Sequence, residues 1–350
     1  MRFCLVGCGR IAHRHADLIG GGQVQGAELA GVCDINDRLA RQFGEKFRVP
    51  FFVDMHSMVK AVDPDVIVVL TESGNHAKHV IELSEHRRHI VVEKPMALRL
   101  TDADAMIDAC RRVGIKLFVV KQNRFNVPVV KAREAIEAGR FGQLVLGTVR
   151  VRWCRPQSYY DQAPWRGTWA MDGGVLTNQA SHHVDLLQWF LGDVESVSAK
   201  SSTALACIEA EDTAVAILRF RSGALGVIEA TTATRPADLE GSLSILGSGG
   251  TVEIGGFAVN QMKTWHFVDR RGEDDEVLNK YSVNPPNVYG FGHKAYYDHV
   301  VACIQNEKGK MVDGAEGRKS LELINAIYES IESGQDTIIP FSSTRSRLGR

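Results

Sequence analysis

The sequence predicts an α/β protein of two parts. A doubly wound parallel sheet comes first, and an α+β domain with a large open, mostly antiparallel sheet follows. Over the first 120 residues, Val- and Ile-rich runs alternate with helical patterns, as expected for parallel strands covered on both faces. Beyond residue 123, strand-like runs outnumber helices. Short turns such as 221–223 separate several of these runs, which is typical of antiparallel sheets.

The elements of the first part are expected where apolar runs and helical spacing alternate. The strands are predicted at 2–6, 28–33, 50–53, 66–70, 90–93 and 116–120. Between them, helices are predicted at 11–19, 38–47, 57–61, 76–86 and 101–113. This order of strand and helix is the pattern of βαβ units that share one parallel sheet.

The second part begins with a helix at 128–139, which has proline near its start and glycine at its end. Its strands are predicted at 144–153, 194–203, 212–220, 224–233, 241–247 and 250–254. Its other helices are predicted at 180–191, 291–306 and 315–332. We therefore expect two domains, comprising residues 1–122 and 123–340, with the second also carrying the contacts between subunits.

Composition excludes several classes of function. The net charge of −1 over 350 residues gives no global basic field for nucleic acid or an anionic membrane. No leader-like start and no apolar run of the ~18–20 residues that span a bilayer is present. The seven cysteines are odd in number and include no CxxC pair, which favours reduced thiols in a cytoplasmic protein without a metal site.

A glycine-rich turn follows the first predicted strand. Gly7, Gly9 and Ala12 fit the spacing G-x-G-x-x-G/A. The first glycine permits a tight turn, the second lets main-chain amides approach a pyrophosphate, and the alanine lets the helix pack closely. The amides at the helix start, around Arg10 and Ile11, would bind the phosphates. A purely structural turn is the alternative.

Asp34 strengthens the interpretation of that turn as a dinucleotide site. It ends the second predicted strand, where a carboxylate that accepts both ribose hydroxyls is expected. The same carboxylate would repel the 2′-phosphate of NADP. Ile35 follows it, although Arg38 lies nearby, so the sequence favours NAD as the cofactor.

Lys94 ends the fifth predicted strand, in Glu93-Lys94-Pro95. Ligands of open α/β sheets bind at the carboxyl ends of strands. The following proline restricts the lysine backbone, so a fixed ammonium could stabilise a developing alkoxide. The alternative is a surface lysine paired with Glu93.

Asn178, His182 and Asp185 lie before and within an apolar helix pattern. If the helix begins early, the three share one face. A histidine there could take a hydroxyl proton as hydride leaves the same carbon. A zinc site with His183 and a helix start capped by the asparagine are the alternatives. An amide cannot accept a proton, which leaves Asn178 to orient a substrate.

A mixture of basic, polar and aromatic residues surrounds this motif and suits an anionic, sugar-like substrate. Arginine binds carboxylates and phosphates in bidentate fashion, and aromatic rings stack on sugars or bases. An ordinary interface loop is the alternative. The candidate substrate-binding residues are Lys94, Asn123, Arg152, Arg155, Tyr159, Arg166, Asn178 and His182.

The turn, Asp34, the segment 71–76 and Glu93-Lys94-Pro95 together resemble the Gfo/Idh/MocA oxidoreductases, over nearly the whole chain. The resemblance implies a Rossmann domain followed by an open-sheet domain. It also implies that Lys94 is catalytic near the nicotinamide and that His182 is the base, assisted by Lys94. The cofactor-binding residues it implies are Gly7, Gly9, Arg10, Ile11, Asp34, Thr71, Ser73, Asn75, His76, Glu93, Lys94 and Gln122.

Four further segments, 121–126, 165–182, 289–294 and 313–318, resemble the UDP-N-acetylglucosaminuronate 3-dehydrogenases within that family. This resemblance implies NAD-dependent oxidation of the sugar 3-hydroxyl in the synthesis of diacetamido-uronic acids for lipopolysaccharide O-antigen. It also implies a homotetramer and a possible 2-oxo acid that accepts hydride from NADH. A dehydrogenase of another polyol, such as inositol, and a catalytically silent NAD-binding protein are the alternative functions.

Overall fold

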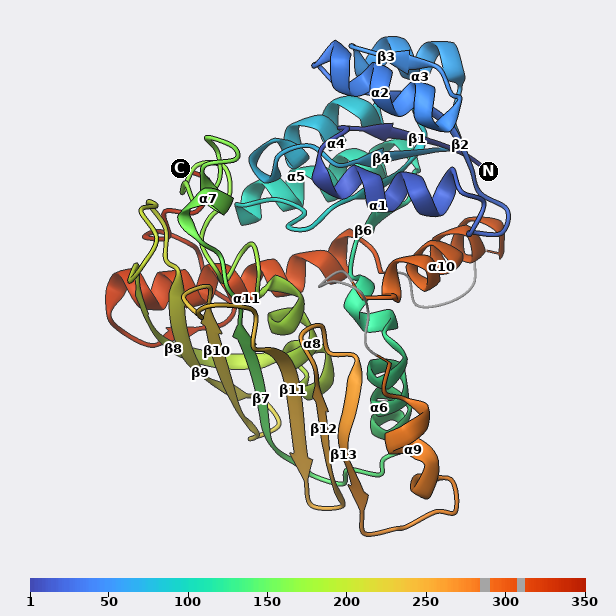
Figure 1. The fold of residues 1–350 in the computed structure, drawn as a ribbon. Helices are drawn as coiled ribbons and strands as arrows, with labels where there is room; N and C mark the ends of the chain where they lie inside the picture. The colour runs from blue at the N-terminus through green and yellow to red at the C-terminus, as the bar shows by residue number, and fades with distance from the viewer. Residues whose placement is uncertain (284–289, 307–311) are drawn as a thin grey trace. The chain divides into compact units, whose positions relative to one another are not determined.

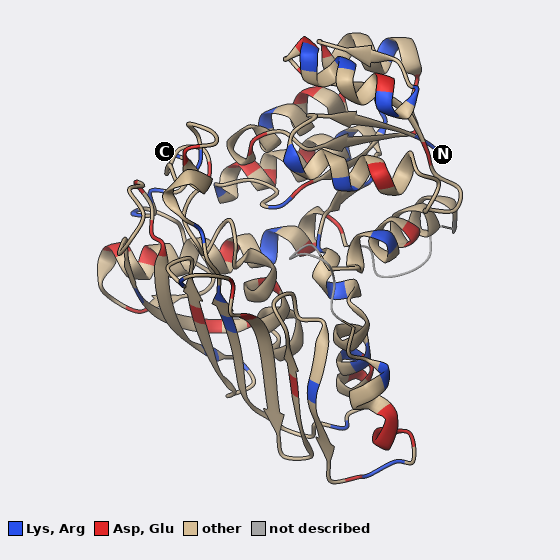
Figure 2. Cartoon of the chain, in the orientation of Figure 1, with Lys and Arg blue, Asp and Glu red and all other residues tan. Residues whose placement is uncertain are grey.

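A computed structural model of the chain describes residues 1–283, 290–306 and 312–350. Tyr289, part of one segment of the resemblance, lies outside the described residues. The chain forms two compact units: Met1–Lys121 with His293–Arg318, and Gln122–Gly292 with Lys319–Arg350. Among the described residues, no helix is both long and apolar enough to cross a membrane. Basic and acidic residues are mixed along both units (Figure 2).

The first unit is built on a six-stranded, all-parallel sheet with the strand order β3-β2-β1-β4-β5-β6. Every residue of β4 is buried, as is nearly all of β1 and β5, so both faces of the sheet are covered. This confirms the predicted doubly wound sheet. The strands are β1 (Arg2–Val6), β2 (Glu28–Cys33), β3 (Phe51–Phe52), β4 (Val66–Val69), β5 (His89–Val92) and β6 (Leu117–Val119).

Helices from two distant parts of the sequence pack in the first unit (Figure 1). Five follow the strands: α1 (Arg10–Ile19), α2 (Asp37–Phe47), α3 (Met55–Val62), α4 (His76–Ser84) and α5 (Leu100–Val113). A sixth, α10 (Gly292–Asn306), follows β7 to β13, seven of the eight strands of the second sheet, in the chain. Tyr297 of α10 is fully buried and meets Phe3 of β1 edge to face, with ring centroids 5.8 Å apart. Lys116 also donates to the carbonyl of Cys303 at 2.6 Å.

The second unit contains an eight-stranded sheet with the order β13-β12-β11-β7-β10-β9-β8-β14. All its neighbouring strands are antiparallel except β7 and β10, which confirms the mostly antiparallel prediction. The strands are β7 (Leu144–Arg152), β8 (Val194–Ser202), β9 (Thr213–Phe220), β10 (Leu225–Thr231), β11 (Glu240–Gly247), β12 (Gly250–Gly255), β13 (Gln261–Phe267) and β14 (Thr337–Ile338).

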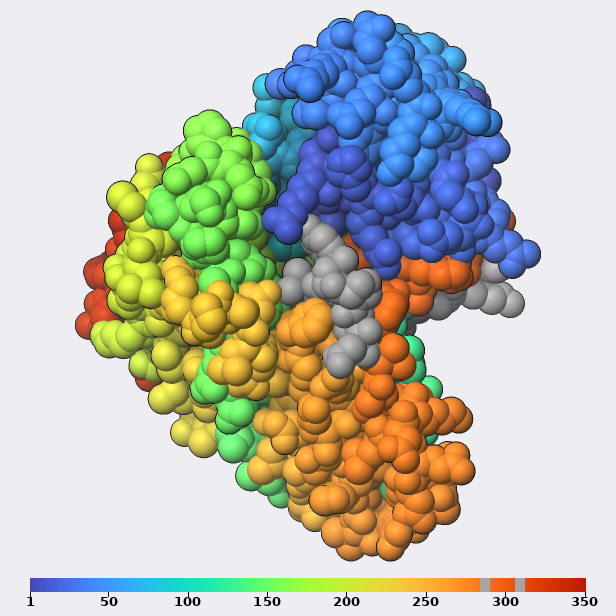
Figure 3. Space-filling view, in the orientation of Figure 1, coloured from blue at the N-terminus to red at the C-terminus, as the bar shows by residue number. Residues whose placement is uncertain are grey.

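Helix α8 (Ser181–Leu191) covers one face of this sheet. Its Leu187 and Leu191 pack so closely on β7 that a Cβ at Gly147 would lie 2.7–2.8 Å from their methyl groups. Along β9, buried and outward-facing positions alternate, as expected for a sheet with one solvated face. In Figure 3 green to orange atoms, from the part of the chain that contains these strands, form much of the surface of this unit that faces the viewer. The other helices are α6 (Val127–Glu137), α7 (Gln157–Tyr160), α9 (Asp274–Lys280) and α11 (Gly314–Ser333), the last of which begins in the first unit.

The last residues of the chain are docked on the second unit. The carboxylate of Glu329, on α11, accepts hydrogen bonds from the main-chain amides of Thr344, Arg345 and Ser346. The Leu348 side chain is 1% exposed. The main chain of this segment is therefore held in place, although its arginine side chains extend into solvent.

Candidate active site

The glycine-rich turn lies between β1 and α1, beside the end of β4. Gly7 has φ +100°, and a Cβ there would lie 2.7 Å from the carbonyl oxygen of Leu70. Two constraints therefore require glycine at this position. A Cβ on Gly9 would meet no atom within 4 Å, so packing within the protein does not require that glycine. No side chain caps the start of α1, which leaves its first amides suited to a pyrophosphate.

Asp34 lies next to this turn at the end of β2. Its Oδ2 accepts from the amide of Cys8 at 2.8 Å, and its Oδ1 accepts from the amide of Asn36 at 2.8 Å. The carboxylate is thereby oriented at the rim of the turn, where a ribose is expected. The side chain of Ile35 is 91% exposed. These residues fit NAD, whose pyrophosphate and ribose would bind at the turn and at Asp34.

The segment after β4 contains four of the predicted cofactor-binding residues. Ser73 is buried and begins a 3-10 turn, and Asn75 donates to Glu72 at 3.2 Å. The hydroxyl of Thr71 hydrogen-bonds Nδ1 of His79 at 2.9 Å. The fourth, His76, is described separately because its surroundings differ.

His76 is 1% exposed and lies inside the first unit. Its Nδ1 hydrogen-bonds the carbonyl of Pro95 at 2.7 Å, and its Nε2 hydrogen-bonds the carbonyl of Thr71 at 2.9 Å. Burial lowers the pKa of His76, and the bonds to the two carbonyls oppose that shift. The ring thus joins the segments that follow β4 and β5, and its nitrogens are both engaged.

Glu93 and Lys94 follow β5 directly. Oε2 of Glu93 accepts from the amide of Lys94 at 2.9 Å, and Oε1 bonds Nε2 of His15 at 2.9 Å. Burial alone would raise the pKa of Glu93, but the His15 hydrogen bond and nearby positive groups lower it to about 2. Glu93 is therefore an ionised carboxylate, and each of its oxygens accepts a hydrogen bond inside the first unit. The peptide bond between Lys94 and Pro95 is cis.

In the second unit, α8 begins at Ser181, later than the shared-face interpretation requires. Asn178 therefore precedes the helix, whereas His182 and Asp185 lie on it. The residue at the helix start is Ala180, and no side chain caps the helix, so Asn178 is not its cap. Asn178 instead donates to Oδ1 of Asp172 at 2.6 Å, and Oδ2 of Asp172 accepts from the amide of Gly167 at 2.9 Å.

His182 is 8% exposed, and its Nε2 lies 2.8 Å from the amide nitrogen of Gln122. An amide NH₂ only donates, so Nε2 accepts this hydrogen bond and carries a lone pair rather than a proton. An imidazole in this form can take a proton at Nε2. The structure thus places Gln122, predicted to contact the cofactor, directly on the candidate base.

Asp185 is held by Arg124. The guanidinium donates two bonds, Nε to Oδ2 at 2.7 Å and Nη2 to Oδ1 at 2.8 Å, and both side chains are buried. Arg124 also lies 4.9 Å from the ring of Trp189. His183 packs edge to face on Trp153, and burial lowers its pKa to about 4. In the described part of the chain, the Asp185 carboxylate is thus paired with a guanidinium, and the ring of His183 packs on an aromatic side chain.

Tyr159 lies between two guanidinium groups. Arg166 lies 4.5 Å and Arg155 5.5 Å from its ring centroid, and Arg166 also donates to the tyrosine hydroxyl at 2.7 Å. Arg155 pairs with Asp238 at 3.0 Å. Asn123 is 4% exposed, and its Oδ1 is a buried acceptor without a hydrogen-bond partner in the described part of the chain. These polar groups are suited to bind an anionic sugar.

Arg152 lies apart from them. It alternates along β7 with the positions that pack under α8, and it pairs with Glu229 at 2.6 Å and Glu240 at 3.1 Å. Its side chain thus lies on the sheet face opposite α8, and two carboxylates already neutralise it. The structure does not bring this predicted substrate residue together with His182.

Sequence reasoning missed the residues that support the site from behind. Glu211 is one of them: its Oε1 accepts from the amide of Leu176 at 3.0 Å and from the hydroxyl of Tyr328 at 2.9 Å. Tyr328 also hydrogen-bonds Thr177 at 2.9 Å, beside Asn178. None of these residues belongs to a spacing motif. The one available signal in the sequence was an acidic residue, Glu211, just before a predicted strand.

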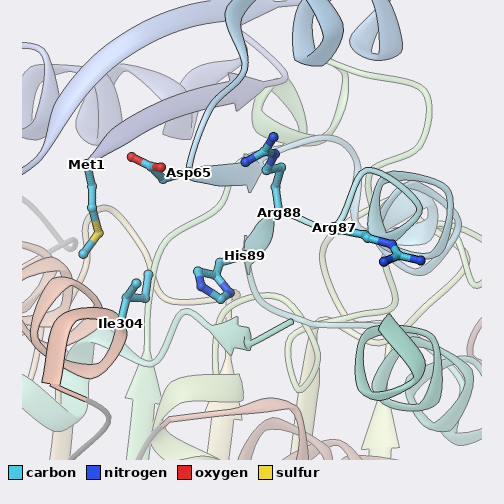
Figure 4. Close-up of a pocket in the computed structure, with 6 residues that line it drawn as sticks. All are labelled: Met1, Asp65, Arg87, Arg88, His89 and Ile304. Atoms are coloured by element: carbon cyan, nitrogen blue, oxygen red, sulfur yellow. The ribbon is translucent and has the colours of Figure 1, made fainter. Parts of the chain in front are cut away.

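A surface hollow lies elsewhere in the first unit (Figure 4). It lies at the amino ends of β1, β4 and β5, whereas the glycine-rich turn lies at their carboxyl ends. Its Asp65 accepts from the amide of Arg2 at 2.8 Å, and Arg87 points away from the other labelled side chains. Nothing connects it with the candidate active site. Its lining residues are Met1, Asp65, Arg87, Arg88, His89 and Ile304.

Two family models match the chain. Residues 1–121 match the oxidoreductase family, NAD-binding Rossmann fold, and residues 133–339 match the oxidoreductase family, C-terminal alpha/beta domain. Among curated proteins, the chain is 27% identical over 348 residues to a myo-inositol 2-dehydrogenase of Thermotoga maritima, covering 95% of this chain and 96% of that protein.

Two solved structures are more similar. The WlbA dehydrogenase of Bordetella pertussis, solved in complex with NADH and UDP-GlcNAcA, is 45% identical, with a TM-score of 0.92 and 98% of each chain covered. The WlbA dehydrogenase of Chromobacterium violaceum, solved with the same ligands, is 42% identical, with a TM-score of 0.91; 98% of this chain and 96% of that one are covered. The chain is thus an NAD-dependent dehydrogenase of the sugar and polyol type, acting on a CH–OH group, and it belongs to the Gfo/Idh/MocA oxidoreductase family.

Proposed function

We propose that this protein oxidises the 3-hydroxyl of UDP-N-acetylglucosaminuronate to a 3-keto sugar nucleotide, with NAD as the hydride acceptor. The observation that carries the proposal is the 45% identity, over 98% of the chain, to a dehydrogenase solved with NADH and UDP-GlcNAcA. The cationic and aromatic groups around Tyr159 support an anionic sugar as the substrate.

In the proposed reaction, the C3–H bond breaks and its electron pair passes as hydride to the nicotinamide of NAD. The 3-hydroxyl proton passes to Nε2 of His182; the sugar hydroxyl first displaces the Gln122 N–H that bonds the lone pair of this nitrogen in the structure. Lys94 donates a hydrogen bond to the same oxygen and stabilises its developing negative charge. Asn178 orients the sugar.

For recognition, we propose that Arg155 and Arg166 bind the uronate or the diphosphate, and that Asn123 accepts a hydrogen bond from the sugar. Bidentate pairing is the mode in which guanidinium groups bind both kinds of anion. Arg152 has no place in this proposal, because Glu229 and Glu240 occupy it on the other face of the sheet.

The reaction would supply a step in the synthesis of diacetamido-uronic acids for lipopolysaccharide O-antigen. We further propose a 2-oxo acid as the acceptor that returns NADH to NAD, and assembly as a homotetramer. Val215, Ile217 and Leu225 are exposed on the sheet face opposite α8, which supports assembly through that face. Light scattering after size exclusion measures the mass of the assembly.

The test is to mix the protein with NAD and UDP-N-acetylglucosaminuronate, follow absorbance at 340 nm, and identify the product by mass spectrometry. We expect a product lighter by two hydrogen atoms and no turnover of UDP-N-acetylglucosamine, the matched sugar without the carboxylate. Adding a 2-oxo acid should convert a single turnover into many if NADH stays bound.

A polyol dehydrogenase is the second candidate, because a myo-inositol 2-dehydrogenase shares 27% identity over 95% of the chain. Myo-inositol therefore belongs in the same assay. Turnover of inositol without turnover of the UDP-sugar would overturn the proposed substrate and leave the NAD-dependent chemistry intact.

A further inference from the structure

Three side chains that are far apart in the sequence form one buried hydrogen-bonded chain in the first unit. The hydroxyl of Tyr297, on α10, bonds Nδ1 of His15, on α1. Nε2 of His15 bonds Oε1 of Glu93 at 2.9 Å, and Oε2 of Glu93 accepts from the amide of Lys94 at 2.9 Å. Tyr297 and His15 are 0% exposed, and Glu93 is 6% exposed.

The protons of this chain can be assigned from the chemistry of its ends. Burial raises the pKa of Tyr297 well above its usual value, so its hydroxyl keeps its proton and donates to Nδ1. Glu93, whose pKa is lowered to about 2, is an ionised carboxylate that only accepts, so Nε2 of His15 donates a proton to it. Each group thus donates or accepts as its neighbour requires, and the chain ends in a carboxylate against the Lys94 main chain.

A metal ion is the competing interpretation of the same place. The ligand atoms of His15, Glu93 and His293 all lie within 4.8 Å of one another. Both nitrogens of His15 already have partners, Tyr297 and Glu93, and an ion would have to break one of these bonds. We therefore favour the hydrogen-bonded chain, and removal of metal is one arm of the test.

We propose that Tyr297 and His15 are positioning residues for Lys94, acting through Glu93. They hold the carboxylate in one orientation, so that it fixes the lysine main chain and keeps a negative charge beside the lysine. The inference rests on the proposed function only for the role of Lys94 in turnover.

The physical basis is the cost of a loose buried carboxylate. Without its partner, a buried carboxylate is desolvated and tends to take up a proton. Protonated Glu93 would have no negative charge, and its hydrogen bond from the Lys94 amide would weaken. Because the charge of Glu93 favours the ammonium form of a neighbouring lysine, its loss lowers the lysine pKa. His15 also lies on α1, the helix that starts at the cofactor turn, so the chain joins the cofactor turn to the lysine.

The first experiment measures Lys94 without any substrate. Wild-type protein, Glu93→Gln and Tyr297→Phe are labelled briefly with acetic anhydride over a range of pH, and acetylation of Lys94 is quantified by mass spectrometry. We expect the midpoint to fall by about one pH unit in Glu93→Gln, and by less in Tyr297→Phe, because the ammonium loses a neighbouring negative charge. Unchanged midpoints in both variants would overturn the proposal, whatever the substrate proves to be.

The second experiment separates kcat from KM in whichever substrate the wild-type enzyme oxidises. Tyr297→Phe should lower kcat about tenfold and leave the Kd for NADH within about twofold, since a misplaced catalytic group weakens the chemical step. Tyr296→Phe is the matched control: Tyr296 is the neighbouring buried tyrosine on α10, and its ring centroid lies 5.7 Å from that of Tyr297. Equal losses in the two variants would show a general packing effect and contradict the positioning role.

Two further arms complete the design. The double variant Glu93→Gln/Tyr297→Phe should be no slower than Glu93→Gln alone, because residues that act as a unit are not additive. A double variant whose loss of kcat is the product of the two single losses would contradict the proposal that the two residues act as one unit. Dialysis against a chelator should change neither activity nor the labelling midpoint; loss of activity that zinc restores would replace the chain with a metal site.

Discussion

The two units hold their predicted site residues by different means. In the first unit the predicted NAD site consists mainly of main-chain elements. They are a glycine turn, the amides at a helix start and the carboxyl ends of parallel strands. In the second unit the groups are held by side chains, as with Gln122 on His182 and Asp172 on Asn178. A site built from main chain has a spacing motif, whereas one built from side-chain pairs has none.

The largest effect is expected from substitutions that remove a reacting side chain, Lys94 in the first unit or His182 in the second. Lys94→Ala and His182→Ala should each lower kcat by roughly 10²- to 10⁴-fold, the usual contribution of a general base or an electrostatic stabiliser. Stopped-flow absorbance at 340 nm measures the rate, and circular dichroism checks the fold. If only one variant is slow, the reacting side chains come from a single unit, which would contradict the proposal that each unit supplies one.

Next, the turn tests the main-chain site at two glycines. Gly9→Val should weaken NADH binding about 100-fold with little change in melting temperature, because a Cβ at Gly9 would meet no protein atom within 4 Å but would stand where the pyrophosphate approaches the main chain. Gly7→Ala should instead destabilise the fold, given its φ of +100° and the nearby Leu70 carbonyl. Fluorescence titration and thermal denaturation separate the two outcomes. The same loss of stability in both would contradict the open space at Gly9.

The side-chain site is tested at the partner of Asn178. Asp172→Asn should raise KM for the sugar nucleotide about tenfold, since the Asn178 amide loses its charged acceptor. The Kd for NADH should stay within about twofold. A change in cofactor binding as large as the change in KM would show that the two parts of the site are not separable in this way.

Arg152, on β7, and Arg166, in the segment between α7 and α8, offer a smaller contrast. Arg166→Ala should raise KM for the UDP-sugar several-fold, because an exposed charged contact contributes about 1 kcal/mol. Arg152→Ala should leave KM near its wild-type value, since its partners are Glu229 and Glu240. Steady-state kinetics decide between them. An equal rise in KM for both variants would show that Arg152 also binds the substrate.

The effect furthest from catalysis is a pH dependence of stability at Glu211. Burial raises its pKa from 4.5 to about 7, so the folded protein binds this proton more tightly than the unfolded chain does. Its contribution is fully present below pH 4.5 and is lost as the pH rises through 7. Glutamine has no proton to lose in this range. Between pH 5 and pH 8 the free energy of unfolding should therefore fall less in Glu211→Gln than in the wild type, by roughly 2–3 kcal/mol at pH 8. Urea denaturation at pH 5 and pH 8 measures it; a parallel decline in both proteins would contradict it.

Sequence periodicity was sufficient for most of the fold. β1 and β2 have the predicted bounds, because each is a buried run that ends at a turn residue. The structure adds α7, α9, β13 and β14 to the prediction. α9 has a strongly polar sequence, and it is anchored by Asp274, whose pKa Arg140 lowers. β13 pairs across an irregularity between Glu253 and Ile254, which local patterns do not reveal.

The site was predictable in proportion to its dependence on local sequence. The turn, Asp34 and Lys94 follow strand ends and were found from spacing and resemblance. Gln122 against His182 and Arg124 against Asp185 join residues 60 and 61 positions apart. Such pairings arise only when the chain folds, so no pattern within either segment announces them.

The return of α10 to the first sheet has a consequence for how the protein is made. The nucleotide-binding unit is completed by residues 293–318, which leave the ribosome after seven of the eight strands of the second sheet. Until then Phe3 lacks the aromatic ring that covers it, and His15 lacks its hydroxyl partner. Although domains commonly fold from the amino end as they emerge, this one reaches its final form late, and a gene fragment ending near residue 121 should yield an unstable product.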